Sequence, residues 1–262
     1  MCDETEKLTE AMQNTVREIV SVLNGRVHSI WLYGSLVLDD FRPGWSDIDL
    51  IAFAEDPITE TQAMRLVPLR QSLLETFSDN PFYACFEGAI LPLDAYRTHT
   101  PATTVYWGTS GQRTVERYAL DPFSRYELSE RGRSLYGNDD RCIFTCPSRD
   151  ELVAAVRRHY EAIRTCAVQT DESLYACGWL LDIARGIYTL KNGGVIGKTQ
   201  AGEWALAERL FSDEASLKRT LEIRRNPLAH KEDAETREWL RQLGPTVQRC
   251  ADVLEAELNE RG

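Results

Sequence analysis

The sequence has no long apolar run. Hydrophobic residues make up 43% of its 262 positions, yet no apolar stretch approaches the roughly 20 residues that a membrane-spanning helix needs. The first ten residues, MCDETEKLTE, are acidic and polar, unlike a signal or transit peptide. We therefore expect a soluble, cytoplasmic protein with no membrane partner.

Paired cysteines are also missing. The seven cysteines are scattered along the chain, and none of them forms a CxxC pair. This pattern is typical of reduced thiols, several of them small core residues, and it does not indicate a zinc site. The residues are Cys2, Cys85, Cys142, Cys146, Cys166, Cys177 and Cys250.

Basic residues are in deficit, because 30 Lys and Arg stand against 41 Asp and Glu, giving a net charge of −11. A protein that binds nucleic acid needs a basic stripe for the phosphate backbone, so we expect no nucleic-acid partner and favour a cationic ligand or a bound metal. Residues 1–150 carry −9 of this charge and residues 151–262 carry −2. The acidity could equally serve solubility alone.

The first half of the chain predicts a small mixed sheet covered by helices. Apolar residues recur at helical spacing over residues 9–23, and Asn24-Gly25 ends that helix. VHSIWLYG and DIDLIAFA are predicted to be strands, residues 59–77 a helix, and PFYACFEGAILPL a third strand. Strands joined by a crossing helix favour a mixed sheet with helices packed on it.

The second half predicts a helical bundle. SRDELVAAVRRHYEAIRTCAV begins at a Ser N-cap, and DESLYACGWLLDIARGIYTLKNGG ends at a Gly pair. Three more helical segments follow near residues 199–211, 214–224 and 233–259. The predicted fold class is therefore α+β, with domains 1–148 and 149–262 and a boundary in GNDDRCIFTCPSRD.

Two aspartates begin the second predicted strand. Asp47 and Asp49 lie two residues apart and therefore share a face, while Ile48 and Leu50 point to the opposite side. Two carboxylates this close either share a proton or hold a cation. Hard oxygen ligands at this spacing suit Mg²⁺, which proteins hold through one or two carboxylates and substrate phosphates.

A Gly-Ser pair precedes the aspartates. Gly34 lets the backbone approach closely after a strand, and Ser35 adds a hydroxyl beside backbone N–H groups, as in loops that cradle phosphates. Ser46, directly before Asp47, adds one more donor. The order and spacing of these residues indicate a nucleotide site at the end of a strand.

A third carboxylate lies on the third predicted strand. Glu87 stands among apolar and aromatic neighbours in YACFEGAIL. It is either a solvated residue on an edge strand or, beside the aspartates, a third metal ligand or the acceptor of a proton from an attacking hydroxyl.

Gly-Ser, eleven residues, Asp-x-Asp and then a later carboxylate resemble the pattern of the polymerase-β-like nucleotidyltransferases. HSIWLYGSLVLDDFRPGWSDIDLIAF resembles the start of the aminoglycoside 3''- and 9-adenylyltransferases, which inactivate streptomycin and spectinomycin. ALDPFSRYELSERGRSLYG and GGVIGKTQAGEWAL resemble the linker and the helical C-terminal domain of that group, so the resemblance covers nearly the whole chain. It implies a polymerase-β-like N-terminal domain and an all-α C-terminal bundle.

The resemblance also implies roles for single residues. Asp47 and Asp49 would bind two Mg²⁺ ions, and Glu87 would be both a ligand and the base that deprotonates the drug hydroxyl. Gly34, Ser35 and Ser46 would contact the triphosphate of ATP, in a cleft between the two domains.

Three further nucleotide contacts are implied for Asp121, Arg185 and Lys198. The alternative for Asp121 is a turn or cap residue, and the alternative for the two cations is a solvated helix face.

The drug pocket departs from the family pattern. A Trp follows GE in the family, and the nearest candidate in this chain is Trp107 in TTVYWGTSG, which is otherwise a core residue. TDESLYACGW keeps Asp171 and Glu172 of the family's GDERN but lacks its Arg-Asn pair. The resemblance thus implies Trp107, Asp171 and Glu172 as substrate-binding residues and leaves the identity of the drug open.

Other functions compete with this interpretation. RRNPLAH places Arg225 and His230 at the RNxxxH spacing of HEPN ribonucleases, whose domains accompany small nucleotidyltransferases in toxin–antitoxin pairs. The same chemistry could also act on a lincosamide, a small alcohol or a protein hydroxyl. A degenerate fold that binds nucleotide without turnover would not need three clustered carboxylates.

The interpretation that the sequence favours is an antibiotic-resistance enzyme. It would be a monomer that uses Mg²⁺ and ATP to transfer AMP to a hydroxyl of an aminoglycoside or aminocyclitol, with spectinomycin and streptomycin as the first candidates, and releases pyrophosphate.

Overall fold

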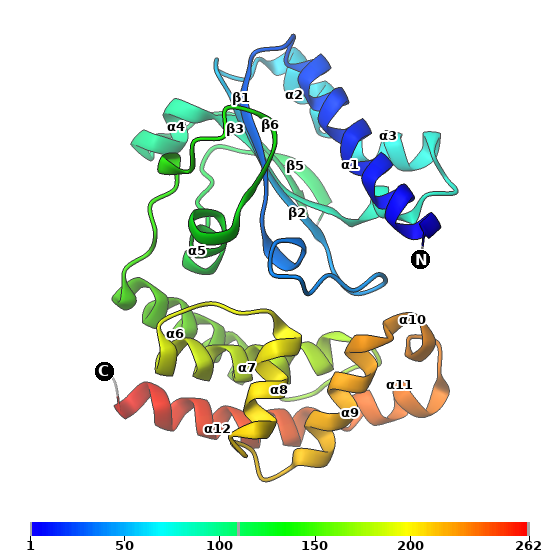
Figure 1. The fold of residues 1–262 in the computed structure, drawn as a ribbon, viewed down its shortest axis with the longest axis vertical. Helices are drawn as coiled ribbons and strands as arrows, with labels where there is room; N and C mark the ends of the chain where they lie inside the picture. Colours follow the sequence, from blue (N-terminus) through cyan, green and yellow to red (C-terminus); the bar gives the residue numbers. More distant parts are fainter. Residues whose placement is uncertain (1, 109–110, 261–262) are drawn as a thin grey trace. The chain divides into compact units, whose positions relative to one another are not determined.

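The structure, a computed structural model, describes residues 2–108 and 111–260 (Figure 1). The chain folds as two compact units. The first comprises Met1–Val37, Asp47–Leu120 and Glu127–Thr145, and the second comprises Leu38–Ser46, Asp121–Tyr126 and Cys146–Gly262. Two short segments from the first half of the sequence therefore belong to the second unit.

The first unit is built on a six-stranded sheet with the order β5-β4-β3-β2-β1-β6. β2 and β3 run parallel, and all other neighbouring pairs are antiparallel. The predicted mixed sheet is confirmed. The strands are β1 (Val27–Leu32), β2 (Ile48–Ala54), β3 (Phe86–Pro92), β4 (Thr104–Gly108), β5 (Gly111–Val115) and β6 (Arg133–Gly137).

Helices in the first unit follow the predicted order with one correction. α1 (Cys2–Val22) ends before Asn24 and Gly25, which both adopt positive φ angles, as a helix stop requires. The helix predicted over residues 59–77 is wrong as a single element, because Pro68 separates α2 (Glu60–Leu66) from α3 (Leu69–Thr76). Proline has no backbone N–H to continue the helix.

The strand predicted over PFYACFEGAILPL is wrong in its first part, because Pro81–Cys85 form the 3-10 helix η2, which the side chain of Asn80 caps, and β3 begins at Phe86. The remaining short elements of this part of the chain were not predicted. They are η1 (Gly34–Leu36), α4 (Leu93–Thr98), α5 (Pro122–Arg131) and η3 (Arg141–Ile143). In α5 the residues from Glu127 onward belong to the first unit.

One face of the sheet carries both the core and the candidate carboxylates. Ile51 and Phe53 of β2 point to the same face of the sheet and are buried in a cluster with Trp31 of β1. Asp49 shares their face, because strand residues two apart point the same way. The candidate site therefore lies at one end of a sheet face that is otherwise filled by apolar side chains.

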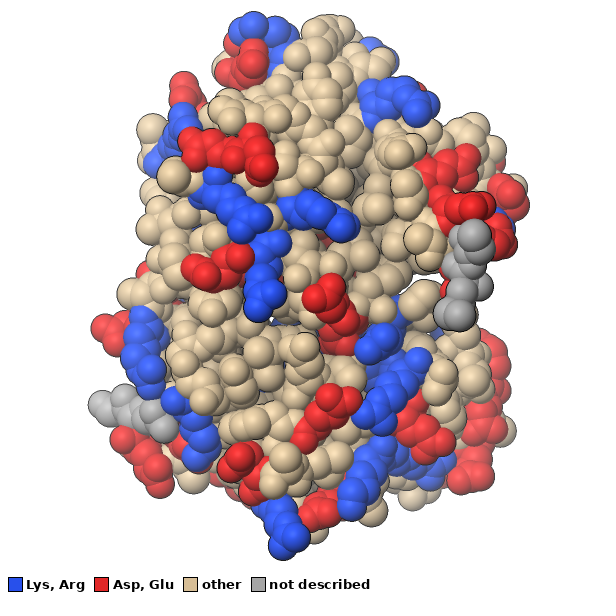
Figure 2. Space-filling view, in the orientation of Figure 1, with Lys and Arg blue, Asp and Glu red and all other residues tan. Residues whose placement is uncertain are grey.

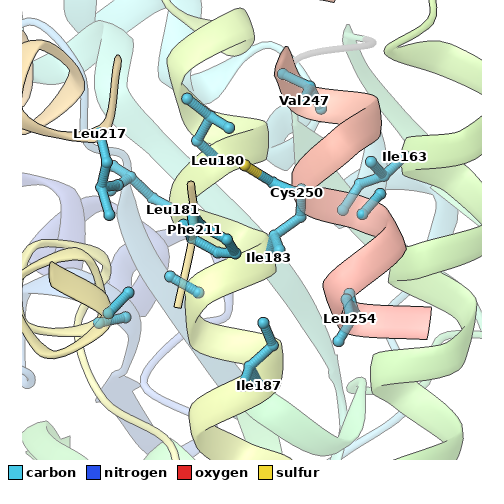
Figure 3. Close-up of a cluster of buried hydrophobic side chains, with 14 of the residues drawn as sticks. Ile163, Leu180, Leu181, Ile183, Ile187, Phe211, Leu217, Val247, Cys250 and Leu254 are labelled. Atoms are coloured by element: carbon cyan, nitrogen blue, oxygen red, sulfur yellow. The ribbon is translucent and has the colours of Figure 1, made fainter. Parts of the chain in front are cut away.

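The second unit is an all-α assembly centred on α7 (Tyr175–Asn192), which packs against α6, α8, α9, α11 and α12. Figure 3 shows its Leu180, Ile183 and Ile187 meeting side chains such as Leu254 of α12. The other helices are α6 (Arg149–Cys166), α8 (Lys198–Ala207), α9 (Glu214–Arg225), α10 (Pro227–His230), α11 (Ala234–Arg241) and α12 (Gly244–Glu260).

The helix predicted over residues 233–259 is also wrong as a single element. α11 ends at Arg241 and α12 begins at Gly244. Pro245 lies in the first turn of α12 and has no backbone N–H with which to continue a helix from α11. A Cβ atom at residue 244 would also crowd the carbonyl oxygen of Val168, so the backbone passes close to that segment.

Within residues 2–108 and 111–260, no helix is long and apolar enough to cross a membrane. The cysteines whose side chains are described, Cys85 to Cys250, are free thiols, and Cys177 and Cys250 are buried, as expected. On the face shown in Figure 2, acidic and basic side chains are interspersed. The absence of a nucleic-acid partner stays a prediction.

Candidate functional site

The Gly-Ser turn and the second aspartate form one tightly packed feature. Gly34 follows β1 and begins η1 with a φ of +70°, and a Cβ atom at this position would overlap the carboxylate of Asp49. The backbone N–H of Tyr33 donates to the carbonyl oxygen of Asp49 at 3.1 Å. Glycine is therefore required both for its backbone conformation and for the space it leaves.

The third carboxylate lies beside the aspartates. In the parallel β2·β3 pair Asp49 is in register with Glu87, and partners in register on adjacent strands project from the same face. Asp47 lies two residues before Asp49 and is exposed. The sheet thus gathers three acidic side chains that are up to 40 positions apart in the sequence.

Glu87 has a hydrogen-bond partner that the sequence did not reveal. The hydroxyl of Tyr106 on β4 donates to Glu87 Oε1 at 3.1 Å. Burial raises the pKa of Tyr106, and the negative charges of Glu87 and Asp47 raise it further. The Tyr106 hydroxyl is therefore a protonated donor at neutral pH. The negative charges of Asp47 and Glu87 both act on this hydroxyl.

The described residues do not form a complete metal site by themselves. Among the residues with described coordinates, no group of three or more His, Cys, Asp or Glu side chains is arranged to hold a metal. Proteins can hold Mg²⁺ through one or two carboxylates and let substrate phosphates complete the coordination, and Asp47 and Asp49 are of the chemical type that this arrangement needs. Ser35 Oγ is buried and has no hydrogen-bond partner in the described part of the chain, so it is available to a ligand oxygen.

A buried carboxylate, also missed by sequence reasoning, holds the glycine turn. Glu127 is only 5% exposed, and its Oε2 accepts a hydrogen bond from the backbone N–H of Gly34 at 3.1 Å. The contact spans 93 positions in the sequence. No local pattern in ELSERG could have indicated it, because the partner is a backbone group.

In the second unit the two predicted nucleotide-binding cations share one carboxylate. Asp182 Oδ1 lies 3.0 Å from Arg185, and its Oδ2 lies 3.0 Å from Lys198. The Arg185 guanidinium also covers the ring of Phe123 at 5.1 Å. Burial lowers the pKa of Lys198 and opposes the effect of Asp182. The structure brings Arg185 and Lys198 together, and neither is a freely solvated cation.

The segment between the Gly-Ser pair and the aspartates is anchored in the second unit. Asp40 and Arg224 are each 2% exposed and form an ion pair of 2.8 Å. The backbone N–H of Thr199 also donates to Asp40, and Arg224 stacks over Trp45 at 5.1 Å. These residues carry no recognisable motif, so sequence reasoning missed them.

Ser46 belongs to the same segment. Its Oγ accepts a hydrogen bond from the backbone N–H of Arg42 at 3.0 Å, which closes a turn. The hydroxyl hydrogen of Ser46 is left to donate elsewhere.

Asp121 caps α5. Its carboxylate accepts from the backbone N–H of Phe123 at 2.7 Å and from the hydroxyl of Ser124 at 2.9 Å. The observed contacts are those of the cap alternative.

The proposed drug-contacting residues differ in their surroundings. Trp107 is 1% exposed, and its indole N–H donates to the carbonyl oxygen of Leu66 at 3.0 Å. A core residue of this kind offers no surface to a drug, so its assignment to the pocket is corrected. Asp171 and Glu172 are exposed before α7, where Asp171 accepts from Ser173 and Glu172 pairs with Arg241.

Comparisons with known proteins bear on the family and on the fold. Residues 14–82 match the family model of the nucleotidyltransferase domain. The predicted resemblance to the nucleotidyltransferases is therefore confirmed over residues 14–82. No curated protein sequence matches the chain significantly.

A solved structure extends the comparison beyond that domain. The chain is similar to spectinomycin adenyltransferase AAD(9) from Enterococcus faecialis, solved with ATP and spectinomycin, with a TM-score of 0.64 and 18% identity over 93% of this chain and 98% of that one. At this identity the likeness establishes the α+β fold. A toxin–antitoxin structure with AMP-PNP aligns to 55% of this chain and 81% of its own, with 14% identity and a TM-score of 0.27, from which nothing follows.

Proposed function

We propose that the protein transfers AMP from Mg²⁺-ATP to a hydroxyl group of an aminoglycoside or aminocyclitol antibiotic and releases pyrophosphate. The observation that carries the proposal is the juxtaposition of Gly34, Asp49 and Glu87 at one end of the sheet face. The structural neighbour solved with ATP and spectinomycin supports the choice of nucleotide and acceptor.

In this proposal Glu87 is the base. Its carboxylate takes the proton from the drug hydroxyl as that oxygen attacks the α-phosphate in line with the leaving pyrophosphate. Ser35 Oγ, which is buried without a partner among the described residues, donates to a phosphate oxygen. Arg185 and Lys198 supply positive charge to the phosphates.

Asp47 and Asp49 would hold the metal, and the carboxylate of Glu87 serves as the base. Magnesium, when bound, neutralises negative charge on the phosphates and the leaving group. Because the described residues contain no three-ligand group, the nucleotide has to complete the coordination, and we expect ATP and Mg²⁺ to bind cooperatively.

The decisive variant is Glu87→Gln, which keeps the shape of the side chain and removes the base. We expect turnover to fall at least about a hundredfold, the scale of a general base, while ATP still binds in a calorimetric titration. Glu130→Gln alters an exposed glutamate of α5 and should leave turnover unchanged. Near-normal turnover in Glu87→Gln would refute the assignment.

The ribonuclease alternative is tested by a different variant. Arg225 ends α9 and pairs with exposed Glu203 at 2.6 Å, and His230 ends α10. We expect His230→Ala to retain drug modification. RNA cleavage by the wild-type protein that is lost in His230→Ala would favour the ribonuclease instead.

A further inference from the structure

The environment of Glu87 contains a second functional side chain on the neighbouring strand. In the antiparallel β3·β4 pair, Ala89 is in register with Tyr106. The phenol of Tyr106 therefore reaches diagonally, by two residues, to the carboxylate of Glu87. This hydrogen bond joins the Tyr106 hydroxyl to the Oε1 atom of Glu87.

Tyr106 is itself held in place by its neighbours. Arg113 of β5 is its register partner, and its guanidinium lies 4.9 Å from the centre of the ring. The ring of Tyr118 lies 6.2 Å away. On the hydroxyl side, Gly108 leaves the necessary space, because a Cβ atom at that position would overlap the Tyr106 hydroxyl.

These contacts define the direction of the glutamate side chain. A glutamate has three rotatable side-chain bonds, and a charged one beside two aspartates is repelled by them. A hydroxyl donor at Oε1 restricts the rotation of the side chain and leaves the other oxygen, Oε2, outside this hydrogen bond. Small misplacements of a catalytic group can cost two orders of magnitude in rate.

We propose that Tyr106 is a positioning residue that fixes Glu87 through Oε1 so that Oε2 accepts the proton of the attacking hydroxyl. The proposal rests on the function proposed above. Tyr106 keeps its own proton throughout: the hydroxyl proton moves to Glu87 Oε2, the acceptor oxygen bonds to the α-phosphorus, and the bond to pyrophosphate breaks.

The test is Tyr106→Phe, which removes the hydroxyl and keeps the ring beneath Arg113. We expect kcat to fall about tenfold or more while the KM for each substrate and the calorimetric Kd for Mg²⁺-ATP stay within about twofold, because the lost interaction acts in the transition state. Gly108→Ala should produce the same split, since it displaces the same hydroxyl.

Tyr83→Phe is the matched control. The Tyr83 hydroxyl accepts from Asn14 at 2.7 Å elsewhere in the first unit, so its loss changes stability without changing kcat. In the Glu87→Gln background, Tyr106→Phe should add no further loss, because the two residues act as one unit.

The outcomes separate the two proposals. If Glu87→Gln abolishes turnover and Tyr106→Phe leaves kcat unchanged, or raises KM alone, then Tyr106 is not a positioning residue and the base assignment survives. If Glu87→Gln retains normal turnover, the base assignment itself fails, and the positioning role fails with it.

Discussion

At the scale of single residues, Gly34 is the position with the least tolerance. Its φ of +70° and the carboxylate of Asp49 over its Cα leave no room for a side chain. Gly34→Ala must therefore move either the turn or the aspartate that we propose as a metal ligand. We expect turnover to fall by roughly a hundredfold, the effect of a misplacement near 1 Å, as measured by pyrophosphate release.

Gly25→Ala is the control for backbone strain. Gly25 has a similar φ of +74°, but a Cβ atom there meets nothing within 4 Å. This variant should lose about 1 kcal/mol of stability from the left-handed conformation and keep full activity. Equal activity losses in both variants would show that strain, rather than the contact with Asp49, explains the Gly34 effect.

The residues that sequence reasoning identified are those whose signal is local. Gly34, Asp47 and Asp49 lie in one short stretch, where strand periodicity assigns their faces. Tyr106 and Glu127 act through partners 19 and 93 positions away, and only the sheet pairing brings them close. Trp107 was assigned to the drug pocket from its position in a motif, but alternation on β4 directs it into the core.

At the scale of elements, a buried ion pair anchors the segment between the Gly34-Ser35 pair and Asp47. Asp40 and Arg224 are each 3% exposed in their side chains, whereas neighbouring Arg225 and Glu203 are about half-exposed. We expect Arg224→Met to lower the free energy of unfolding by about 3–5 kcal/mol, because it strands a buried carboxylate.

Arg225→Met is the matched control for that change. An exposed ion pair contributes about 0–1 kcal/mol to stability, so the urea midpoint of Arg225→Met should hardly differ from that of the wild type. Similar losses in both variants would contradict the proposed importance of burial.

The same pair predicts a pH dependence. Burial would raise the pKa of Asp40, but Arg224 and Thr199 outweigh it and hold that pKa below its ordinary value. A carboxylate with a depressed pKa stabilises the folded state above its unfolded pKa of about 3.9, and this contribution disappears as the pH falls through the folded value. The stability difference between wild type and Asp40→Asn should therefore be largest at neutral pH and shrink below about pH 4 in urea titrations. A constant difference would argue against the charge.

The apolar pattern of the sequence did not indicate where two of the predicted helices are interrupted. The apolar period continues across Pro68 and across Gly244, so residues 59–77 and 233–259 each resemble one helix. The break before Gly244 coincides with Pro245 in the first turn of α12, where a proline is tolerated but could not continue a preceding helix. Periodicity reports the buried face, but it does not report breaks of this kind.

At the scale of the whole molecule, the proposed type of reaction has stronger support than the proposed antibiotic acceptor. The proposed nucleotidyl transfer is supported by the family match to residues 14–82 and by the register of Asp49 with Glu87 in the sheet. The α+β fold extends over 93% of the chain in the comparison with AAD(9), but only 18% of the residues are identical. A net charge of −11 is compatible with a cationic acceptor. The acceptor itself has to be identified by an assay of the reaction product.

The most direct measurement is the reaction of the purified protein with ATP, Mg²⁺ and, in turn, spectinomycin, streptomycin, kanamycin and lincomycin, followed by mass spectrometry. We expect spectinomycin or streptomycin to gain one AMP group with equimolar release of pyrophosphate. We also expect no product when Mg²⁺ is chelated or Glu87 is replaced by Gln. A folded protein that binds ATP but transfers AMP to none of the four drugs would refute the proposed function.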